Sequence, residues 1–177
     1  VYEEKENYPP LIIQARGLAS ERPVTIGMDE SSQYLSGLLL AAPLAHSSLT
    51  FTIGGSKVVS WPYVSLTLQC LNDFGIPFVT ETRAGEGAPW TETDWHGLTQ
   101  ILPGLFRITV SPAPYRPGWF RVEGDWSNAS YLVAAGALGR QEVRVTGLSA
   151  TSLQGDRALL DILSRMGASL KPCNGGV

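Results

Sequence analysis

The sequence predicts an α/β (α+β) fold in which a β-α-β-α-β unit occurs about twice, the second copy being incomplete. The turn Asp29-Glu30-Ser31-Ser32 aligns with Asp125-Trp126-Ser127-Asn128, and each turn opens an apolar helix after a strand-like stretch. Residues 71–75 align in the same way with residues 163–167, where a glycine ends a second helix. Repetition at this scale indicates a duplicated supersecondary unit, and short strand-to-helix connections require some strands to pair in parallel through a crossover.

In the first copy, apolar runs bounded by turn residues predict strands, and apolar residues at helical spacing predict helices. The expected strands are residues 11–15, 24–27, 49–53, 76–80 and 105–111. The expected helices are residues 34–45, with Pro43 near the end, and a helix that begins after Ser60, with Pro62 in its first turn and Gly75 at its C′ position. Residues 81–104 are rich in Gly, Thr, Pro and Trp, and we expect a long surface excursion or hairpin arm there.

The second copy follows a linker at residues 112–118, which carries three prolines. Strands are expected at residues 120–123, 141–146 and 168–171. Helices are expected at residues 129–138 and from residue 154 to Gly167.

Composition excludes several classes of protein. With 44% hydrophobic and 16% charged residues, the 177-residue chain can bury a core. A net charge of −3 argues against broad binding of nucleic acid or anionic membranes, and no apolar run approaches the ~20 residues of a membrane span. We find no signal peptide. Cys70, in an apolar helix, and Cys173, in a polar tail, form no disulfide pattern, which favours a reducing, cytoplasmic setting.

The histidines and the chain ends give two further expectations. His46 and His96 are isolated, so we expect no metal site. The chain starts at Val1 rather than Met and stops at Gly175-Gly176-Val177, so we expect a piece of a longer protein.

The polar cluster at residues 28–33 is the first candidate site. It lies between the strand at residues 24–27 and the apolar helix that follows. Hydroxyl groups and free backbone N–H groups at a helix start form a ready anion site, here for a phosphorylated substrate. Simple helix capping by Ser and Asp is the alternative.

Four motifs occur in one order, each at a predicted helix start. They are Ser31-Ser32-Gln33-Tyr34-Leu35, Ser60-Trp61-Pro62-Tyr63, Glu123-Gly124-Asp125-Trp126-Ser127-Asn128-Ala129-Ser130-Tyr131 and Ser152-Leu153-Gln154-Gly155-Asp156. The series closely resembles the middle of the 3-phosphoshikimate 1-carboxyvinyltransferase (EPSP synthase) family and covers less than half of a full member. The resemblance implies an inside-out α/β barrel of repeated β-α-β-α-β-β units in two domains. Residues 1–121 would end the first domain, and residues 122–177 would start the second.

The resemblance also implies an activity and a binding site. The family transfers the enolpyruvyl group of phosphoenolpyruvate to the 5-hydroxyl of shikimate 3-phosphate in the shikimate pathway, without a cofactor. Ser31, Ser32 and Ser60 would bind the shikimate phosphate, and Tyr63 would pack against or hydrogen-bond to the shikimate ring. Gln33 would bind shikimate 3-phosphate and reach the phosphoenolpyruvate pocket. The family's acid/base groups match no position here, so no catalytic residue is assigned, and the chain alone is expected to be inactive. The parent enzyme is expected to be a monomer.

Two positions depart from the family pattern, and two acids invite a second interpretation. Trp61 stands where the family usually has Lys, which could change the charge of the phosphate pocket, and Asn128 replaces a usual Ser. Asp125 and Asp156 could be read as a carboxylate pair. Capping is favoured, because a negative side chain at a helix start stabilises by ~0.3–1 kcal/mol.

Two rival functions remain open at this point. One is UDP-N-acetylglucosamine enolpyruvyl transferase of peptidoglycan synthesis, which shares the repeat fold but has a nucleotide-sugar substrate. The other is a non-catalytic domain that reuses the repeat and binds no shikimate 3-phosphate.

Overall fold

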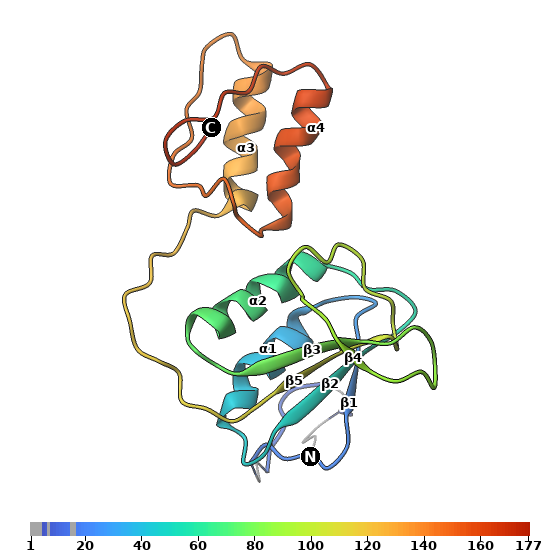
Figure 1. Cartoon of the computed structure of the whole chain (residues 1–177). Coiled ribbons are helices and arrows are strands. Elements are labelled where there is room, and N and C mark those ends of the chain that lie inside the picture. Colours follow the sequence, from blue (N-terminus) through green and yellow to red (C-terminus); the bar gives the residue numbers. More distant parts are fainter. Residues whose placement is uncertain (1–4, 7, 15–16) are drawn as a thin grey trace.

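The computed structural model describes residues 5–6, 8–14 and 17–177, which form an α/β chain with two packed regions (Figure 1). The first region is a five-stranded sheet with two helices, and the second is a pair of helices. The strands are β1 (Val24–Gly27), β2 (Leu49–Gly54), β3 (Phe78–Thr82), β4 (Thr91–Glu92) and β5 (Phe106–Val110). The helices are α1 (Gln33–Ala41), α2 (Trp61–Asp73), α3 (Trp126–Leu138) and α4 (Leu159–Arg165), with 3-10 turns η1 (Ala42–Leu44) and η2 (Gly155–Ala158).

The sheet has the strand order β1-β2-β5-β3-β4. Strands β1 and β2 are parallel and are joined through α1, which confirms the predicted crossover. The remaining pairs are antiparallel, and Phe51 of β2 lies opposite Ile108 of β5. Alternate residues of β2 and β5 are buried, as expected for a sheet with one face on the core.

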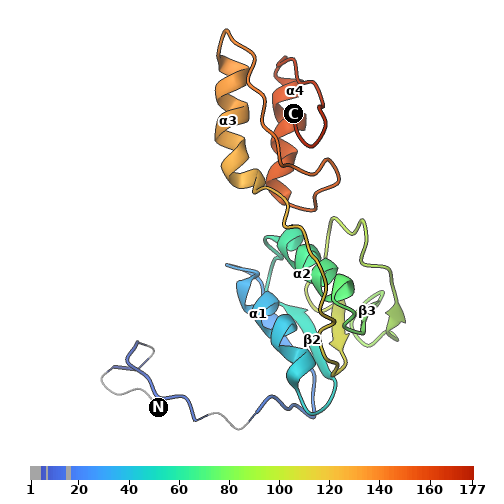
Figure 2. The same ribbon diagram turned by 90° about the vertical axis from the view of Figure 1, so that its left-hand side faces the viewer.

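Helices α1 and α2 lie side by side on one face of this sheet (Figures 1 and 2). The predicted apolar stripes supply the contact, because Leu35 and Leu39 of α1 and Val64, Leu68 and Leu71 of α2 are fully buried. They join a core that continues through the central strands and into the excursion, where Trp95 and Ile101 are buried. Burial of this continuous apolar surface is what holds the two helix starts at fixed positions above the sheet.

Both ends of α2 lie where Pro62 and Gly75 predicted them. Pro62 lies in the first turn of α2, and Gly75 follows its last residues with φ +72°. The Gly75 N–H donates to the Asn72 carbonyl (3.0 Å) and the Ile76 N–H to the Leu71 carbonyl (2.8 Å), which satisfies carbonyls at the helix end. The strand predicted at residues 76–80 starts two residues later, at Phe78.

Residues 81–104 form the predicted hairpin arm, with β4 paired antiparallel to the end of β3. The indole of Trp90 lies between two guanidinium groups, that of Arg83 at 4.7 Å and that of Arg107 at 4.5 Å. Arg107 also makes two hydrogen bonds to Glu81 at 2.6 and 2.8 Å. A desolvated cation over an indole face stabilises the contact, so the arm is held against β3 and β5.

Residues 111–125 connect the two regions without a helix or strand. The Tyr115 hydroxyl donates to the Leu40 carbonyl (2.6 Å), and the Arg116 N–H donates to the Phe74 carbonyl (2.9 Å), so the linker follows the first region. The second region has a small core of its own, formed by Trp126, Ala129, Val133, Val145 and Leu148.

Three strands predicted for the second region are wrong, because residues 120–123, 141–146 and 168–171 form no strand. Backbone pairing there consists of a reciprocal pair of hydrogen bonds between Val145 and Val177 and an isolated bridge between Thr146 and Gly176. A strand is stable only beside a partner ladder, and these segments have no such partner within the described chain.

The strand predicted at residues 11–15 is also wrong where it can be judged. Residues 11–14 are outside any strand, and Ala15 lies outside the described residues. None of the helices in the described ranges combines the length and the apolar character that crossing a membrane requires.

Candidate functional site

A cavity of about 440 Å³ lies between α1 and α2 and extends from their starts to Leu40 and Cys70. All five predicted binding residues line it: Ser31, Ser32, Gln33, Ser60 and Tyr63. Its other lining residues are Ser36, Leu40, Leu66, Thr67 and Cys70. The geometry therefore brings together, at one cavity, residues that are up to 32 positions apart in the sequence.

The start of α1 is only partly capped by its own side chains. Ser32 occupies the N-cap position, yet its buried side chain makes no capping hydrogen bond. The Ser31 hydroxyl accepts a hydrogen bond from the Gln33 N–H (3.1 Å), which is a local turn contact. Simple capping therefore explains Ser31 but leaves the Ser32 hydroxyl to another role.

A carboxylate joins the two loops that carry the serines. Asp29, before α1, accepts hydrogen bonds from the Ser56 N–H (2.7 Å), the Ser56 hydroxyl (2.6 Å) and the Lys57 N–H (3.3 Å). The hydroxyl and amide of Ser56 hold the pKa of the Asp29 carboxyl below its usual range. The Val59 N–H also donates to the Met28 carbonyl (3.1 Å), so the loop before Ser60 is fixed to the loop before Ser31.

Ser60 has an unusual backbone conformation. Its φ of 57° and ψ of 32° place it in the left-handed region, which few residues other than glycine adopt. Ser60 is the one non-glycine residue with positive φ among residues 5–6, 8–14 and 17–177. Strain of this kind persists where the surrounding structure imposes it, and it is often found at functional sites.

Replacing Ser60 with glycine is therefore expected to stabilise the chain by about 1 kcal/mol while removing the hydroxyl from the cavity. Ser60→Ala removes the same hydroxyl but keeps the strain, so we expect no gain in stability from it. Denaturant unfolding of the three proteins measures the difference. Equal stability of Ser60→Gly and Ser60→Ala would show that the left-handed conformation carries no strain.

Two of the lining residues that the sequence analysis missed carry hydroxyl groups. The Thr67 hydroxyl oxygen lies 2.9 Å from the Tyr63 carbonyl and 2.9 Å from the Ser36 hydroxyl, and so links α2 to α1 across the cavity. The available signal was helical spacing: Ser36 follows Ser32, and Thr67 follows Tyr63, by four residues, which places each pair on one helix face.

The acids at the two later helix starts differ from each other. Asp125 caps α3 as predicted, because its carboxylate accepts from the Ser127 N–H (2.9 Å) and the Asn128 N–H (3.3 Å). Asp156 lies in the first turn of η2, but its carboxylate accepts from the Tyr63 hydroxyl (2.7 Å) and caps nothing. Asp156 therefore has the predicted place at a helix start but makes no capping hydrogen bond, and its carboxylate contacts Tyr63 of the candidate site.

Trp61 is not among the residues that line the cavity. Its indole is buried, packs edge-on against Phe106 (5.2 Å between ring centroids) and donates to the Leu98 carbonyl (2.8 Å). The expectation that Trp61 changes the charge of the phosphate pocket has no support in this geometry, because its polar atom is bonded to the arm.

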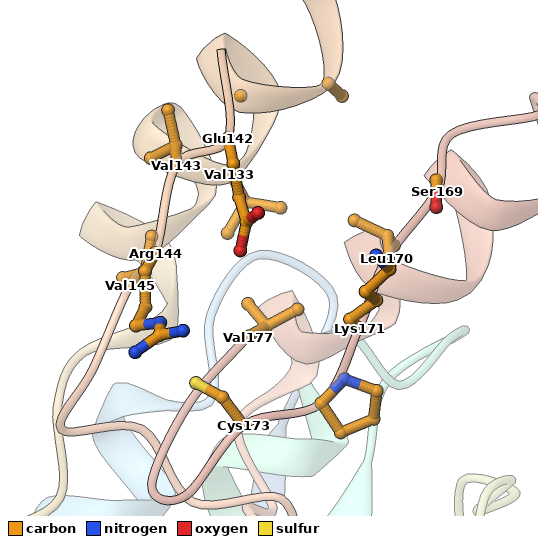
Figure 3. Close-up of a pocket in the computed structure, with 13 residues that line it drawn as sticks. Val133, Glu142, Val143, Arg144, Val145, Ser169, Leu170, Lys171, Cys173 and Val177 are labelled. Carbon is orange, nitrogen blue, oxygen red and sulfur yellow. The ribbon is translucent and has the colours of Figure 1, made fainter.

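Figure 3 shows a second cavity of about 440 Å³, between α3 and the last segment of the chain. Glu142 and Arg144 lie on one side of it and Lys171 on the other, with Val177 and Cys173 between them. None of the predicted binding residues lines it. Its two sides are segments that were predicted as strands and form none, so we do not assign it a function.

Metal-binding groups are absent from the described part of the chain, in which no three His, Cys, Asp or Glu side chains lie close enough to hold an ion. His96 contacts Asp94 at 2.6 Å on the surface and stacks on Trp95. Within residues 5–6, 8–14 and 17–177, no Lys or Arg lines the serine cavity either. Among the described residues, the groups that line this cavity and can donate to an anion are therefore neutral hydroxyls and amides.

Comparison with known protein families decides the wider relationship. The family model described as EPSP synthase (3-phosphoshikimate 1-carboxyvinyltransferase) matches residues 1–89 and 103–175. The chain belongs to the EPSP synthase family. Residues 90–102, in the hairpin arm, are the internal segment outside this match, and they contain Leu98, the partner of Trp61.

Individual relatives agree with the EPSP synthase match. The 3-phosphoshikimate 1-carboxyvinyltransferase of Vibrio cholerae (strain ATCC 39541) is 38% identical over 170 residues, which are 96% of this chain and 35% of the relative. Those of Shewanella baltica (strain OS155) and Paraburkholderia phytofirmans are each 37% identical, over 97% and 96% of this chain. The chain thus spans about a third of the length of the curated relatives it matches.

Proposed function

We propose that this chain forms the shikimate 3-phosphate-binding wall of a 3-phosphoshikimate 1-carboxyvinyltransferase. The observation that carries the proposal is the single cavity lined by Ser31, Ser32, Gln33, Ser60 and Tyr63 at two adjacent helix starts. The complete enzyme transfers the enolpyruvyl group of phosphoenolpyruvate to the 5-hydroxyl of shikimate 3-phosphate and releases phosphate. Membership of the EPSP synthase family supports this reaction over that of UDP-N-acetylglucosamine enolpyruvyl transferase.

The hydroxyls of Ser31, Ser32 and Ser60 bind the phosphate, together with amides at the start of α1. Neutral donors at a helix N-terminus hold an anion in a defined orientation, because the donors are fixed by the backbone. Gln33, which is exposed at the cavity, contacts shikimate 3-phosphate and reaches toward phosphoenolpyruvate. Tyr63 contacts the shikimate ring.

In this proposal the chain supplies binding groups only. Addition and elimination need a positioned acid and base, and within the described residues the carboxylates of Asp125 and Asp156 are engaged with the α3 amides and with Tyr63. We therefore propose that the chain alone is inactive and that the acid/base groups come from other parts of the enzyme.

The two packed regions belong, in this proposal, to two domains, with residues 1–121 in the first and residues 122–177 in the second. The separate cores and the linker at residues 111–125 support that division. The proposal also takes the enzyme as a cytoplasmic monomer, which suits a biosynthetic family without a membrane-spanning helix in the described ranges.

The binding proposal is tested by NMR titration of the 177-residue chain with shikimate 3-phosphate. We expect amide shifts at residues 31–33 and 60 and, in the double variant Ser31→Ala/Ser32→Ala, a loss of affinity of at least tenfold, because each hydrogen bond to a charged group is worth about 1.5–3 kcal/mol. Ser47→Ala, at an exposed loop serine that does not line the cavity, is the control and should bind as the parent does.

Three outcomes count against the proposal. Unchanged affinity in the double variant would show that Ser31 and Ser32 do not bind the phosphate. Preferential binding of UDP-N-acetylglucosamine would favour the rival function, UDP-N-acetylglucosamine enolpyruvyl transferase of peptidoglycan synthesis. Absence of shifts with either ligand would favour a non-catalytic domain that reuses the fold.

A further inference from the structure

The second region touches the candidate site through one side chain, Asp156. Its carboxylate accepts from the Tyr63 hydroxyl at 2.7 Å, 93 residues away in sequence. The neighbouring Gly155 lies against Pro62, since a Cβ at Gly155 would come 3.4 Å from the proline ring. Figures 1 and 2 both show the start of α4, which η2 precedes, beside one end of α2.

This contact determines what Tyr63 can offer a ligand. A phenol has one proton, and an ionised carboxylate can only accept, so the proton of Tyr63 is directed to Asp156. The lone pairs that remain on the phenol oxygen are acceptors. At neutral pH the Tyr63 side of the cavity therefore presents an acceptor, although tyrosine is in general both a donor and an acceptor.

The serines that line the cavity have the reverse character. Ser31, Ser32 and Ser60 bring hydroxyl donors to it, and their positions are fixed by the Asp29 contacts between the two loops. Asp156 contacts the Tyr63 phenol and Asp125 is close enough to act on it, whereas the Asp29 carboxylate near the serines already accepts hydrogen bonds from Ser56 and Lys57. An anion is therefore favoured at the serines and disfavoured at Tyr63, where a neutral hydroxyl donor suits the phenol oxygen.

We propose that Asp156 is a positioning residue that holds Tyr63 as a hydrogen-bond acceptor and so orients the ligand, with its phosphate at the serines and a ring hydroxyl donating to Tyr63. The proposal rests on the proposed function, because it takes shikimate 3-phosphate as a ligand that carries both groups. In this role Asp156, a residue of the second region, contributes to the ligand specificity of a site that is formed in the first region. No bond is made or broken in this role.

The ionisation of Tyr63 supports the same arrangement. The pKa of its hydroxyl is raised above the usual 10, first by the hydrogen bond to Asp156, then by burial and by the charges of Asp156 and Asp125. The phenol therefore keeps its proton through the neutral range. The protonated form is the one stabilised in the folded chain, so this contribution to stability is present below pH 10 and is lost as the pH rises through the raised pKa.

Discrimination between ligands tests the proposal. Shikimate 3-phosphate is compared by NMR titration with its 4-deoxy and 5-deoxy analogues, and the ratio of dissociation constants reports the lost hydroxyl. In the parent chain we expect one analogue to bind roughly tenfold more weakly. In Tyr63→Phe and in Asp156→Ala that ratio should fall to about one to three. The control Asp161→Ala removes an exposed carboxylate of the same region and should keep the parent ratio.

A second measurement needs no ligand. Spectrophotometric titration of the tyrosines, with Tyr63→Phe as the reference, gives the pKa of Tyr63. It should fall toward 10 in Asp156→Asn, which keeps the shape of the side chain but removes its charge, and it should stay raised in Asp161→Ala.

The failures are distinguishable. A parent-like ligand ratio in Asp156→Ala, or in Tyr63→Phe, overturns the positioning role while the serine variants still lose phosphate affinity. An unchanged Tyr63 pKa in Asp156→Asn overturns the hydrogen bond on which the role depends. Loss of stability alone, with the ratio intact, would make Asp156 a purely structural contact. Failure of the proposed function shows separately, as unchanged affinity in Ser31→Ala/Ser32→Ala.

Discussion

Replacing Trp61 with alanine is expected to lower the free energy of unfolding by about 3–5 kcal/mol, the cost of removing a large buried aromatic side chain. Trp61 is 5% exposed and packs edge-on against Phe106 of the central strand β5. Its indole N–H donates to the Leu98 carbonyl at 2.8 Å, so the variant also leaves that acceptor unpaired and loosens the arm.

Trp61→Phe separates the two contributions. It keeps most of the aromatic surface and removes the N–H donor, so its cost should be close to that of one hydrogen bond, about 1 kcal/mol. Trp119, which is fully exposed, provides the matched control, and Trp119→Ala should change stability by less than about 0.5 kcal/mol. Denaturant unfolding followed through the β2 and β5 amides by NMR measures the first region separately. A cost for Trp61→Ala no larger than that for Trp119→Ala would contradict the packing described here.

Gly55→Ala is expected to destabilise the first region by about 2–5 kcal/mol and to disturb the candidate site. Gly55 has φ +97°, where a Cβ costs about 1–2 kcal/mol. The new Cβ would also collide with the Asp29 carboxylate, and forcing atoms into filled space typically costs about 1–3 kcal/mol. Moving Asp29 breaks its contacts with Ser56, so the loop that carries Ser31 should shift and phosphate affinity should fall.

Gly87→Ala is the control, because Gly87 has a similar φ of +81° and open space around it. It should show the backbone cost alone and leave the affinity for shikimate 3-phosphate unchanged. The Asp29 contacts give a pH signature as well. The lowered pKa of Asp29 contributes stability above its usual 3.8 that is lost as the pH falls through the lowered value, and Gly55→Ala should weaken this acid dependence. Equal effects of the two glycine variants would rule out a special role for the approach of Asp29 to Gly55.

The arm and Trp61 together explain a departure from the family pattern. The EPSP synthase match omits residues 90–102, and the resemblance places a lysine where this chain has Trp61. The Trp61 indole donates a hydrogen bond to the Leu98 carbonyl within the unmatched segment, so the tryptophan supports the arm and does not line the serine cavity. The structure offers no account of the second departure, Asn128, whose backbone N–H alone takes part in the α3 cap.

Local sequence determined the elements of the first region and the composition of the site. Apolar residues at helical spacing placed α1 and α2 correctly, because burial of one helix face produces that spacing in any fold. Serines at both helix starts marked the cavity, since hydroxyls and free amides are required there whatever surrounds them. The strands expected in the second region did not form, and local sequence could not show this, because a strand exists only when a partner is present and partners are distant in sequence.

What only the tertiary structure decided are contacts between residues far apart in the chain. Sequence alone determined the serine-lined helix starts and the parallel crossover. Its motifs also carried the resemblance to the EPSP synthase family. It did not show that Trp61 faces the arm, that Asp29 joins two loops, or that Asp156 accepts a hydrogen bond from the Tyr63 hydroxyl. The physical reason is the same for each: a side chain's hydrogen-bond partner is set by which segments pack together, and helical or strand periodicity reports only that a face is buried.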